Sequence, residues 1–322
     1  MATCLPALVL ADARVASVPG LPSGRECKPP RVERPWLDRR QSAECRALEA
    51  LAALTPEERT YFGTAAFGAL GEPPSSPGSG SAQPVSPEVA AARSADAKLG
   101  LPNPGTAADG PNGIADLSDL FGPPPAQRAV GVTAFPNVIT LAATWDRNLS
   151  GRFGRALGRE FRGKGLSGNL GPTLNLIRTW HGGRSAETFG EDPFLIGELA
   201  VPEIRALQRE GVVATIKHFA GNNQEFGRVG IHPDMAGIDA RISEKALHEI
   251  YLPHFKAAVQ RGRAGGVMCS YNKVNGEFAC NNSWLLGQLR EWGFDGTIVP
   301  DAGYAQREAV AAARAGVDAA TP

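Results

Sequence analysis

The chain has 322 residues, which is enough for one large domain with a sizeable hydrophobic core. It carries 33 basic (Lys and Arg) and 33 acidic residues, so its formal net charge is zero and the composition does not support a nucleic-acid or anionic-membrane partner. No run of the sequence approaches the roughly 20 apolar residues that a membrane-spanning helix needs.

The first 98 residues are predicted to precede the main domain, which we expect over residues 99–322. Residues 1–33 are predicted to be a disordered tail. They make a poor secretory signal because they lack a basic start and because Asp12 and Arg14 interrupt the apolar stretch. A lead-in helical segment is predicted over 34–70, with a helix over 44–62, and a Pro-, Gly- and Ser-rich linker over 71–98. The compartment, cytoplasmic or secreted, is left open.

The five cysteines do not form a metal-binding pattern. They are Cys4, Cys27, Cys45, Cys269 and Cys280. None lies in a C-x-x-C pair, so a zinc site is not expected. Cys269 and Cys280 are near enough in sequence to form a disulfide, but two reduced cysteines are the favoured prediction.

Amphipathic helices are predicted in the main domain over residues 150–163, 243–261, 283–292 and 305–315. Ser243 and Ser283 are good residues for starting a helix, and Gly293 and Gly316 are good residues for ending one.

Short apolar runs alternate with these helices over residues 212–216, 267–268 and 298–299, and a fourth run ends near Arg178. Alternating strands and helices indicate an α/β protein with a parallel sheet. Polar residues follow each run, as they do at the active-site end of a barrel, so we predict a (β/α)8 TIM-like barrel. A doubly wound sheet is the alternative. It is disfavoured because no G-x-G-x-x-G or P-loop follows any run.

The polar side chains at these predicted strand ends fit a carbohydrate site. They are Asp109, Arg178, Arg184, Lys217, His218, Tyr271 and Asp301. Charged side chains can hold sugar hydroxyls by paired hydrogen bonds, and a nearby carboxylate can stabilise an oxocarbenium-like transition state.

Each of these residues also has a purely structural explanation. Asp109 is a common turn residue in "ADGPNG", and Lys217 can be a solvated strand end. His218 can be a buried histidine and Tyr271 a core residue with a wet hydroxyl. Asp301 precedes a predicted helix, so it can be an N-cap. The pattern alone leaves these alternatives open.

Metal and cofactor sites are not predicted. His248 and His254 lie six residues apart with a proline between them, which misses the spacing of a zinc-binding helix. His232 and Asp234 lie in a predicted surface loop. No serine lies in a G-x-S-x-G elbow.

Six segments in chain order resemble those of one enzyme family. They are "KLGLPNPGTAADGPNG", "TAFPNVITLAATWD", "LGPTLNLIRTWHGGRSAETFGEDPFLIGELA", "ATIKHFAGNNQEFGR", "EKALHEIYLPHFKAAV" and "GVMCSYNKVNGEFACNNSWLL". Together they resemble the N-terminal barrel domain of family 3 glycoside hydrolases, and within that family the β-glucosidase branch, over roughly residues 99–322. The "PWLDRRQSAECRALEALAALTPEER" segment resembles the family's lead-in helix more weakly.

The resemblance implies a retaining β-glucosidase that releases terminal non-reducing β-D-glucosyl residues, with Asp301 as the nucleophile. The residues that match the family's sugar-binding positions are Asp109, Arg184, Lys217, His218 and Tyr271. Lys217 and Arg184 are expected to keep Asp301 ionised. Arg178 resembles a structural residue. The expected partner is a β-glucoside or oligosaccharide substrate.

The sequence departs from the family pattern at three positions beside the predicted site. Pro300 stands where the family usually has serine, and Ala302 stands where it has an aromatic residue. Pro300 removes a backbone donor and Ala302 removes a stacking face for the sugar. Ala115 replaces an arginine that often helps to bind the sugar.

The resemblance ends at "AGVDAATP", which is similar to the family's eighth strand. We therefore expect the last barrel helix and the second α/β sandwich domain to be absent, and with them the general acid/base Glu of two-domain β-glucosidases. The missing sandwich domain is expected to be a partner of this barrel, either in cis or in trans.

The alternatives are a non-catalytic carbohydrate-binding barrel or inactive fragment, a β-N-acetylglucosaminidase and a β-xylosidase. His232 and Asp234 imitate the N-acetylglucosaminidase His–Asp dyad only loosely. The β-xylosidase branch tends to have Glu where this chain has Asp109.

Overall fold

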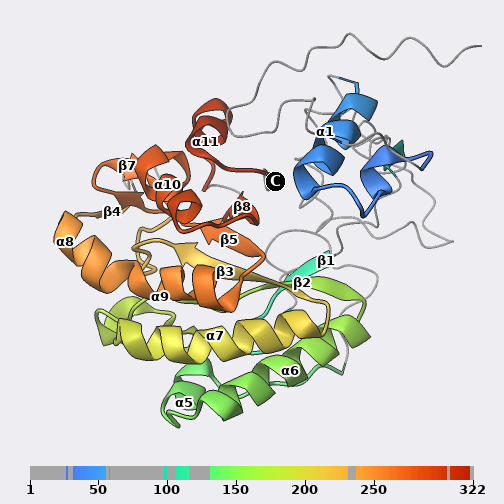
Figure 1. The fold of residues 1–322 in the computed structure, drawn as a ribbon. Coiled ribbons are helices and arrows are strands. Elements are labelled where there is room, and N and C mark those ends of the chain that lie inside the picture. The colour runs from blue at the N-terminus through green and yellow to red at the C-terminus, as the bar shows by residue number, and fades with distance from the viewer. Residues whose placement is uncertain are drawn as a thin grey trace, which may run out of the picture.

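The computed structural model describes residues 27, 32–55, 58, 98–99, 106–115, 131–230, 237–302 and 305–319 (Figure 1). Most of the predicted tail and of the predicted linker lies outside these residues, as do His232 and Asp234. The domain limits drawn from the sequence therefore stay predictions.

Five parallel strands form the central sheet in the order β1-β2-β3-β5-β8. They are β1 (Thr106–Asp109), β2 (Leu166–Leu170), β3 (Val213–Phe219), β5 (Gly266–Cys269) and β8 (Thr297–Pro300). Neighbours in the sheet follow one another along the chain, whereas a doubly wound sheet reverses its order. The predicted α/β class with a parallel sheet is confirmed. The described strands do not show a closed barrel.

Helices connect these strands, and Figure 1 shows α6, α7 and α9 packed along one side of the sheet. The α-helices are α1 (Ala43–Ala53), α5 (Val138–Ala142), α6 (Arg147–Gly163), α7 (Pro193–Arg209), α8 (Glu244–Ala246), α9 (Pro253–Ala257), α10 (Ser283–Glu291) and α11 (Ala309–Ala315). Short 3-10 helices are η1 (Pro35–Leu37), η2 (Trp180–Gly182), η3 (Ser185–Glu187) and η6 (Ala279–Asn281). A separate small sheet contains β4 (Asp239–Ala240), β6 (Lys273–Val274) and β7 (Glu277–Phe278).

The sequence of α6 accounts for its place in the fold. Phe153, Leu157 and Phe161 recur every four residues and are buried on one face of the helix. At its start, Asp146 accepts hydrogen bonds from the backbone N–H groups of Asn148 and Leu149, at 2.8 and 3.0 Å. This cap satisfies donors that the first turn leaves free, so the helix begins slightly before the predicted residue 150.

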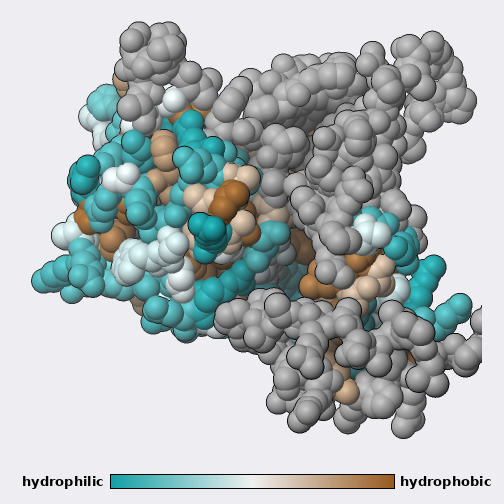
Figure 2. All heavy atoms as spheres, turned by 90° about the horizontal axis from the view of Figure 1, so that it is seen from above, coloured by the Kyte–Doolittle hydropathy of each residue, from teal (hydrophilic) through white to brown (hydrophobic). Residues whose placement is uncertain are grey.

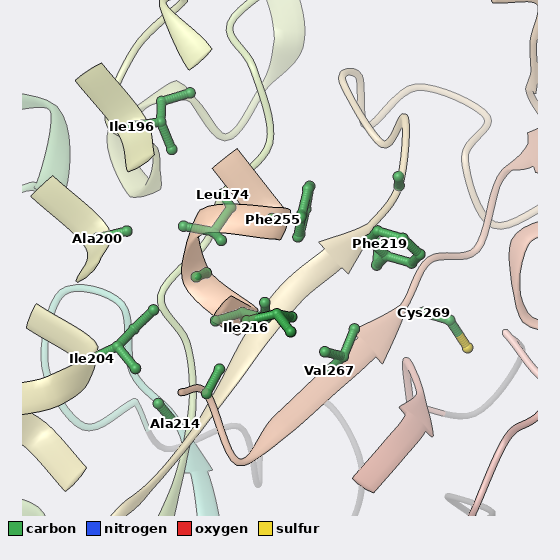
Figure 3. Close-up of a cluster of buried hydrophobic side chains, with 14 of the residues drawn as sticks. Leu174, Ile196, Ala200, Ile204, Ala214, Ile216, Phe219, Phe255, Val267 and Cys269 are labelled. Carbon is green, nitrogen blue, oxygen red and sulfur yellow. The ribbon is translucent and has the colours of Figure 1, made fainter. Parts of the chain in front are cut away.

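The main core lies between β3, β5 and the helices α7 and α9 (Figure 3). Ile216 and Val267 are fully buried and pair in register on adjacent strands. Phe255 of α9 packs edge-on against Phe219 of β3, with ring centroids 5.1 Å apart. Each such side chain contributes roughly 1.5–3 kcal/mol by its burial. The core therefore fixes the carboxyl end of β3.

The other face of the sheet has its own buried cluster of Met268, Val299 and Ala319, against which the partly buried Leu170 packs. Successive residues of a strand point to opposite faces, so Val267 and Met268 belong to different clusters. The strands are covered on both faces, as is usual for parallel sheets.

The apolar run that ends near Arg178 is not a strand. The strand in this region is β2, and residues 171–178 follow it with a single bridge between Thr173 and Lys217. Arg178 is exposed, and its guanidinium lies 5.7 Å from the centre of the Tyr251 ring. It packs against an aromatic ring and does not join the strand ends, which agrees with the structural role expected for it.

Two predicted helices are interrupted. Ser243 does cap its helix, but the segment expected over 243–261 consists of α8, a π-helical turn η4 (Leu247–Tyr251), α9 and a second π-helical turn η5 (Ala258–Gly262). Pro253 has no N–H group to donate, which breaks the regular pattern. The helix expected over 44–62 ends at Ala53. Thr55 and Glu58 then exchange backbone-to-side-chain hydrogen bonds that form a new capping box.

Asp301 is not the cap of the last helix. α11 begins at Ala309, later than the predicted residue 305, and Glu308 occupies the N-cap position. The N-cap explanation of Asp301 is therefore wrong, and Asp301 instead directly follows β8.

The prediction of reduced cysteines is also wrong, because Cys269 and Cys280 form a disulfide. The chain folds back after β5, so that η6 lies beside the strand end and the two Cα atoms are 5.2 Å apart, a normal bridging distance. Sequence separation carries no information about this fold-back. Cys27 and Cys45 form a second disulfide.

On the face shown in Figure 2, hydrophobic residues lie interspersed among hydrophilic ones over the coloured surface. This mixture is ordinary for a protein surface. Within the part of the chain that the structure describes, no helix is long and apolar enough to cross a membrane.

The contact between α6 and α7 makes Gly154 a sensitive position. A methyl group there would lie 2.8 Å from the Cα atom of Glu203, whereas one at Gly151, one turn earlier, would meet Pro202 at an ordinary 3.7 Å. We predict that Gly154→Ala lowers the free energy of unfolding by about 1–3 kcal/mol through overpacking. The matched Gly151→Ala variant should keep or raise it by up to about 1 kcal/mol. Urea denaturation of both variants checks this, and equal effects would contradict it.

Candidate active site

The carboxyl ends of β1 and β3 are joined by a buried ion pair. Lys217 is 3% exposed, and its Nζ donates a hydrogen bond to Oδ1 of Asp109, the last residue of β1. The carbonyl of Asp109 also accepts from the N–H of Ala115, at 2.8 Å. Asp109 thus ends the strand, opens a turn and pairs with Lys217, so the turn explanation and the site explanation are compatible. Lys217 is not a solvated strand end.

His218 is buried and neutral. Its Nδ1–H group donates to Oδ1 of Asn175 at 2.9 Å, and Asn175 Nδ2 donates back to the His218 carbonyl at 2.8 Å. Its Nε2 accepts from Nη1 of Arg184 at 3.2 Å, because a guanidinium can only donate. Burial lowers the pKa of His218 well below 6.5, and the charges of Arg184, Lys217 and Arg228 lower it further. Its Nε2 lies 3.5 Å from Asp301 Oδ2, but a neutral ring makes no ion pair there.

Arg184 is fixed by a two-pronged contact with Glu187. Its Nε and Nη2 donate to the two carboxylate oxygens at 2.8 and 2.6 Å. Burial lowers the pKa of Arg184, but the hydrogen bond and charge of Glu187 more than reverse this, so the guanidinium stays charged. The 3-10 turn η3 brings the two side chains together three residues apart.

Asp301 lies where β8 ends. Its N–H donates to the Cys269 carbonyl at 3.0 Å, which extends the pairing with β5, and its Oδ1 accepts from the N–H of Ala302 at 2.9 Å. Oδ2 lies 3.6 Å from Nη1 of Arg228. Burial raises the pKa of Asp301, and Lys217 and Arg228 oppose that rise. The positive charges act in the expected direction, but burial has the larger effect.

Tyr271 follows β5 and faces Asp301 from the side. Its hydroxyl donates to the carbonyl of Ala302, and the guanidinium of Arg228 lies 4.8 Å from the centre of its ring. Burial raises the pKa of Tyr271, and the charge of Asp301 adds to the rise. Tyr271 is thus a buried aromatic whose hydroxyl points to the segment that carries Asp301.

Asn175, Glu187, Glu225 and Arg228 belong to the site, and the sequence reasoning gave them no role. Glu225 and Arg228 lie in the "NNQEFGR" stretch after His218, and Glu187 lies three residues after Arg184, so their motifs were visible. What was not visible was which side chains contact which. Arg228 contacts both Asp301 and Tyr271, so it is as central as the residues that were predicted.

Two hollows flank the Arg184–Glu187 pair. One, with a cavity volume of only about 20 Å³, is lined by Arg184, His218, Asn222 and Glu225 among others. The second, with about 310 Å³, is lined by Asp109, Asn112 and Glu187 among others. Among the described residues, no group of three or more His, Cys, Asp or Glu side chains could hold a metal ion.

The structure thus brings together Asp109, Arg184, Lys217, His218, Tyr271 and Asp301 at one edge of a parallel sheet and leaves Arg178 outside. A buried carboxylate surrounded by fixed donors on an α/β fold is an arrangement that suits glycosidases.

The chain belongs to glycosyl hydrolase family 3. Its residues 125–320 match the family model described as "Glycosyl hydrolase family 3 N terminal domain". It is 38% identical over 275 residues to a β-glucosidase of Bacteroides ovatus, a match that covers 84% of this chain and 32% of that protein. It is 40% identical over 233 residues to a thermostable β-glucosidase B of Acetivibrio thermocellus, covering 70% of this chain and 29% of that protein.

Solved structures of β-glucosidases are also similar to this chain. β-Glucosidase 3B from Thermotoga neapolitana, in a complex with glucose, matches with a TM-score of 0.69 and 36% identity. That match covers 85% of this chain and 36% of the solved chain. The chain therefore spans about a third of the length of these relatives.

The hydrogen bonds of His218 predict its protonation state. We expect the ring to remain neutral, with the proton on Nδ1, when the pH falls from 8 to 5, because burial and three nearby cations disfavour the imidazolium. Histidine ¹⁵N NMR, assigned by the signal that His218→Gln lacks, measures this. Asn175→Asp places a carboxylate on the Nδ1–H group and should raise the pKa of His218. An imidazolium signal in the unsubstituted protein at pH 6 would contradict the assignment.

Proposed function

We propose that this chain hydrolyses terminal non-reducing β-D-glucosyl residues from β-glucosides, with Asp301 as the nucleophile and with retention of configuration. The observation that carries the proposal is the position of Asp301 after β8, with Arg228 and His218 within 3.6 Å of its Oδ2. The names of the relatives support the substrate class.

In this mechanism the carboxylate of Asp301 attacks the anomeric carbon while the bond to the leaving oxygen breaks. The product is a glycosyl ester on Asp301, which water then hydrolyses from the same face. Asp109, Lys217 and Arg184 bind hydroxyls of the sugar. His218 is neutral, so it adds no charge beside Asp301, and its Nε2 orients Arg184 by accepting a hydrogen bond from Nη1. Tyr271 lies beside the ester through its contact with the Ala302 carbonyl.

We propose that the general acid/base comes from outside the described residues, from a second domain in cis or in trans. Apart from the proposed nucleophile Asp301, the carboxyl groups described at this site are each paired with a cation: Asp109 with Lys217, Glu187 with Arg184 and Glu225 with Arg228. Each of these carboxylates is held in a salt bridge, so none is placed to hand a proton to a leaving group. The greater length of the relatives supports a second contributor.

We also propose that the five-stranded sheet is part of a (β/α)8 barrel. Its sequential parallel order supports this, as does the buried cluster on the face away from the helices. The site would then lie at the carboxyl end of the strands, where barrel enzymes carry their active sites.

A non-catalytic carbohydrate-binding protein is the second candidate function. Pro300 and Ala302 favour it, because neither offers the hydroxyl or the aromatic face that the family pattern places beside the nucleophile. The site of this candidate would bind a sugar through Asp109, Lys217 and His218 without forming a covalent bond.

Covalent trapping separates the two candidates. Incubation with 2-deoxy-2-fluoro-β-D-glucosyl fluoride should add one fluoroglucosyl group to the protein, and peptide mapping should place it on Asp301. Asp301→Asn, which keeps the shape of the side chain, should abolish the adduct and lower activity on aryl β-glucosides by roughly 10⁴-fold or more. Sugar binding with no adduct would favour the non-catalytic candidate. Full activity of the Asn variant would rule out Asp301 as the nucleophile.

The source of the general acid is tested by the leaving group. An aryl β-glucoside with an acidic phenol needs little protonation, whereas cellobiose needs a proton donor. We predict that the chain cleaves cellobiose roughly 10²–10⁴-fold more slowly than the aryl glucoside, because a general acid contributes about that much. Comparable kcat/KM values for both substrates would mean that a described residue supplies the proton.

A further inference from the structure

Arg228 connects two carboxylates at the site. Its Nε lies 2.7 Å from Oε2 of Glu225, and its Nη1 lies 3.6 Å from Oδ2 of Asp301. The same guanidinium lies over the ring of Tyr271, at 4.8 Å from its centre. The side chain is only 16% exposed, so it has little freedom to adopt other positions.

Among the described residues, Nη1 of Arg228 is buried and makes no hydrogen bond. Its 3.6 Å separation from Asp301 is too long for one. Asp301 therefore does not fix the guanidinium by itself. Tyr271 gives it a flat surface but no directional contact. In the described structure, the short charged contact of this guanidinium is the one with Glu225. Glu225 is therefore the contact that can fix how the guanidinium is oriented over the Tyr271 ring.

Glu225 is itself held from two sides. Its backbone N–H donates to the carbonyl of Gly182 at 3.0 Å, and its own carbonyl accepts from the N–H of Arg228 at 3.2 Å. Its Cβ and Cγ atoms lie against Gly183, where a methyl group would come within 2.8 Å of Cγ. Gly183 has a φ of +94°, which further favours glycine. The Gly-Gly-Arg segment thus provides the surface on which Glu225 lies.

We propose that Glu225 is a positioning residue, which holds the guanidinium of Arg228 against Tyr271 and beside the carboxylate of Asp301. The proposal deepens the proposed function, because it assigns to Glu225 the control of the charge next to the nucleophile. It differs from a direct catalytic role, in which Glu225 itself would exchange protons with the substrate.

The charged and titratable groups around Asp301 come from four segments. They are Lys217 and His218 of β3, Arg184 before η3, Glu225 and Arg228 of the following loop, and Tyr271 after β5. His218 is neutral, so Lys217, Arg184 and Arg228 are the positive charges that favour the ionised form of Asp301. Glu225 carries the opposing negative charge.

Because of these charges, the proposal predicts the direction in which the pKa of Asp301 changes when Glu225 is replaced. If Glu225 were only a nearby negative charge, replacing it with Gln would lower the pKa of Asp301, because a repulsive neighbour would be lost. If Glu225 holds Arg228 in place, the same replacement releases the guanidinium and raises the pKa of Asp301. An opposite charge at this distance is typically worth one to three pKa units, so an upward shift of about one unit is expected.

The experiment titrates Asp301 directly in the full chain. Aspartate is labelled with ¹³C at the side-chain carboxyl, and Asp301 is identified as the signal that Asp301→Asn lacks. Glu225→Gln should raise the pKa of this signal, and Arg228→Met should raise it as well. In the Arg228→Met background, Glu225→Gln should no longer raise it. The matched control is Glu210→Gln, which removes a carboxylate paired with Arg162 at the far end of α7 and should leave the signal unchanged.

A downward shift, or no shift, in Glu225→Gln would overturn the proposal. So would an upward shift that persists when Arg228 is absent. The titration requires no turnover, so its result stands even if trapping on Asp301 fails, in which case only the proposed function is lost. Where activity is measurable, the acidic limb of the kcat/KM profile on an aryl β-glucoside should move upward in Glu225→Gln.

Discussion

The buried charge of Lys217 is the constraint on which the rest of the site depends. An ammonium group at 3% exposure is costly unless a carboxylate pairs with it, and the pair must be well aligned to offset the lost hydration. The partner, Asp109, lies on β1, two strands away, so the sheet must hold the ends of β1 and β3 at a fixed separation. The core beneath β3 provides that rigidity through Ile216, Val267 and their neighbours.

The other charged groups of the site are arranged around the Lys217–Asp109 pair. Burial lowers the pKa of His218, and the charges of Arg184 and Lys217 lower it further, so the ring stays neutral and accepts a hydrogen bond from Arg184. Arg184 is held by Glu187, and Arg228 by Glu225. The cations around Asp301 described by the structure thus each have a carboxylate partner of their own. Asp301 lies in the positive field of these cations, with its Oδ2 3.6 Å from Nη1 of Arg228.

Much of this arrangement was predictable from the sequence, because it follows from local patterns. The strands β3, β5 and β8 are short apolar runs followed by polar residues, and the rule that active-site groups lie at strand ends then selects Lys217, His218, Tyr271 and Asp301. Asp109 and Arg184 were grouped with these strand-end residues as well, although neither directly follows one of the named apolar runs, and the family resemblance then implied their sugar-binding roles. The errors fell where a distant contact decides the outcome. The Cys269–Cys280 disulfide depends on how the chain folds back after β5, and the N-cap explanation of Asp301 failed because the following helix begins later. Arg228 and Glu225 could be read in the sequence, but their salt bridge depends on the turn between them, which the sequence did not predict.

The sequential order of the strands has a consequence for how the molecule is made. Each new strand joins the edge of the sheet built by those before it, so the site is completed from residue 109 towards residue 301 as the chain leaves the ribosome. Asp109 and Lys217 can neutralise each other long before β8 exists. Asp301 is the last of these groups to be synthesised, and it enters surroundings whose cations have already found partners. A nascent chain halted before β8 would therefore hold the side chains proposed to bind the sugar, without the proposed nucleophile.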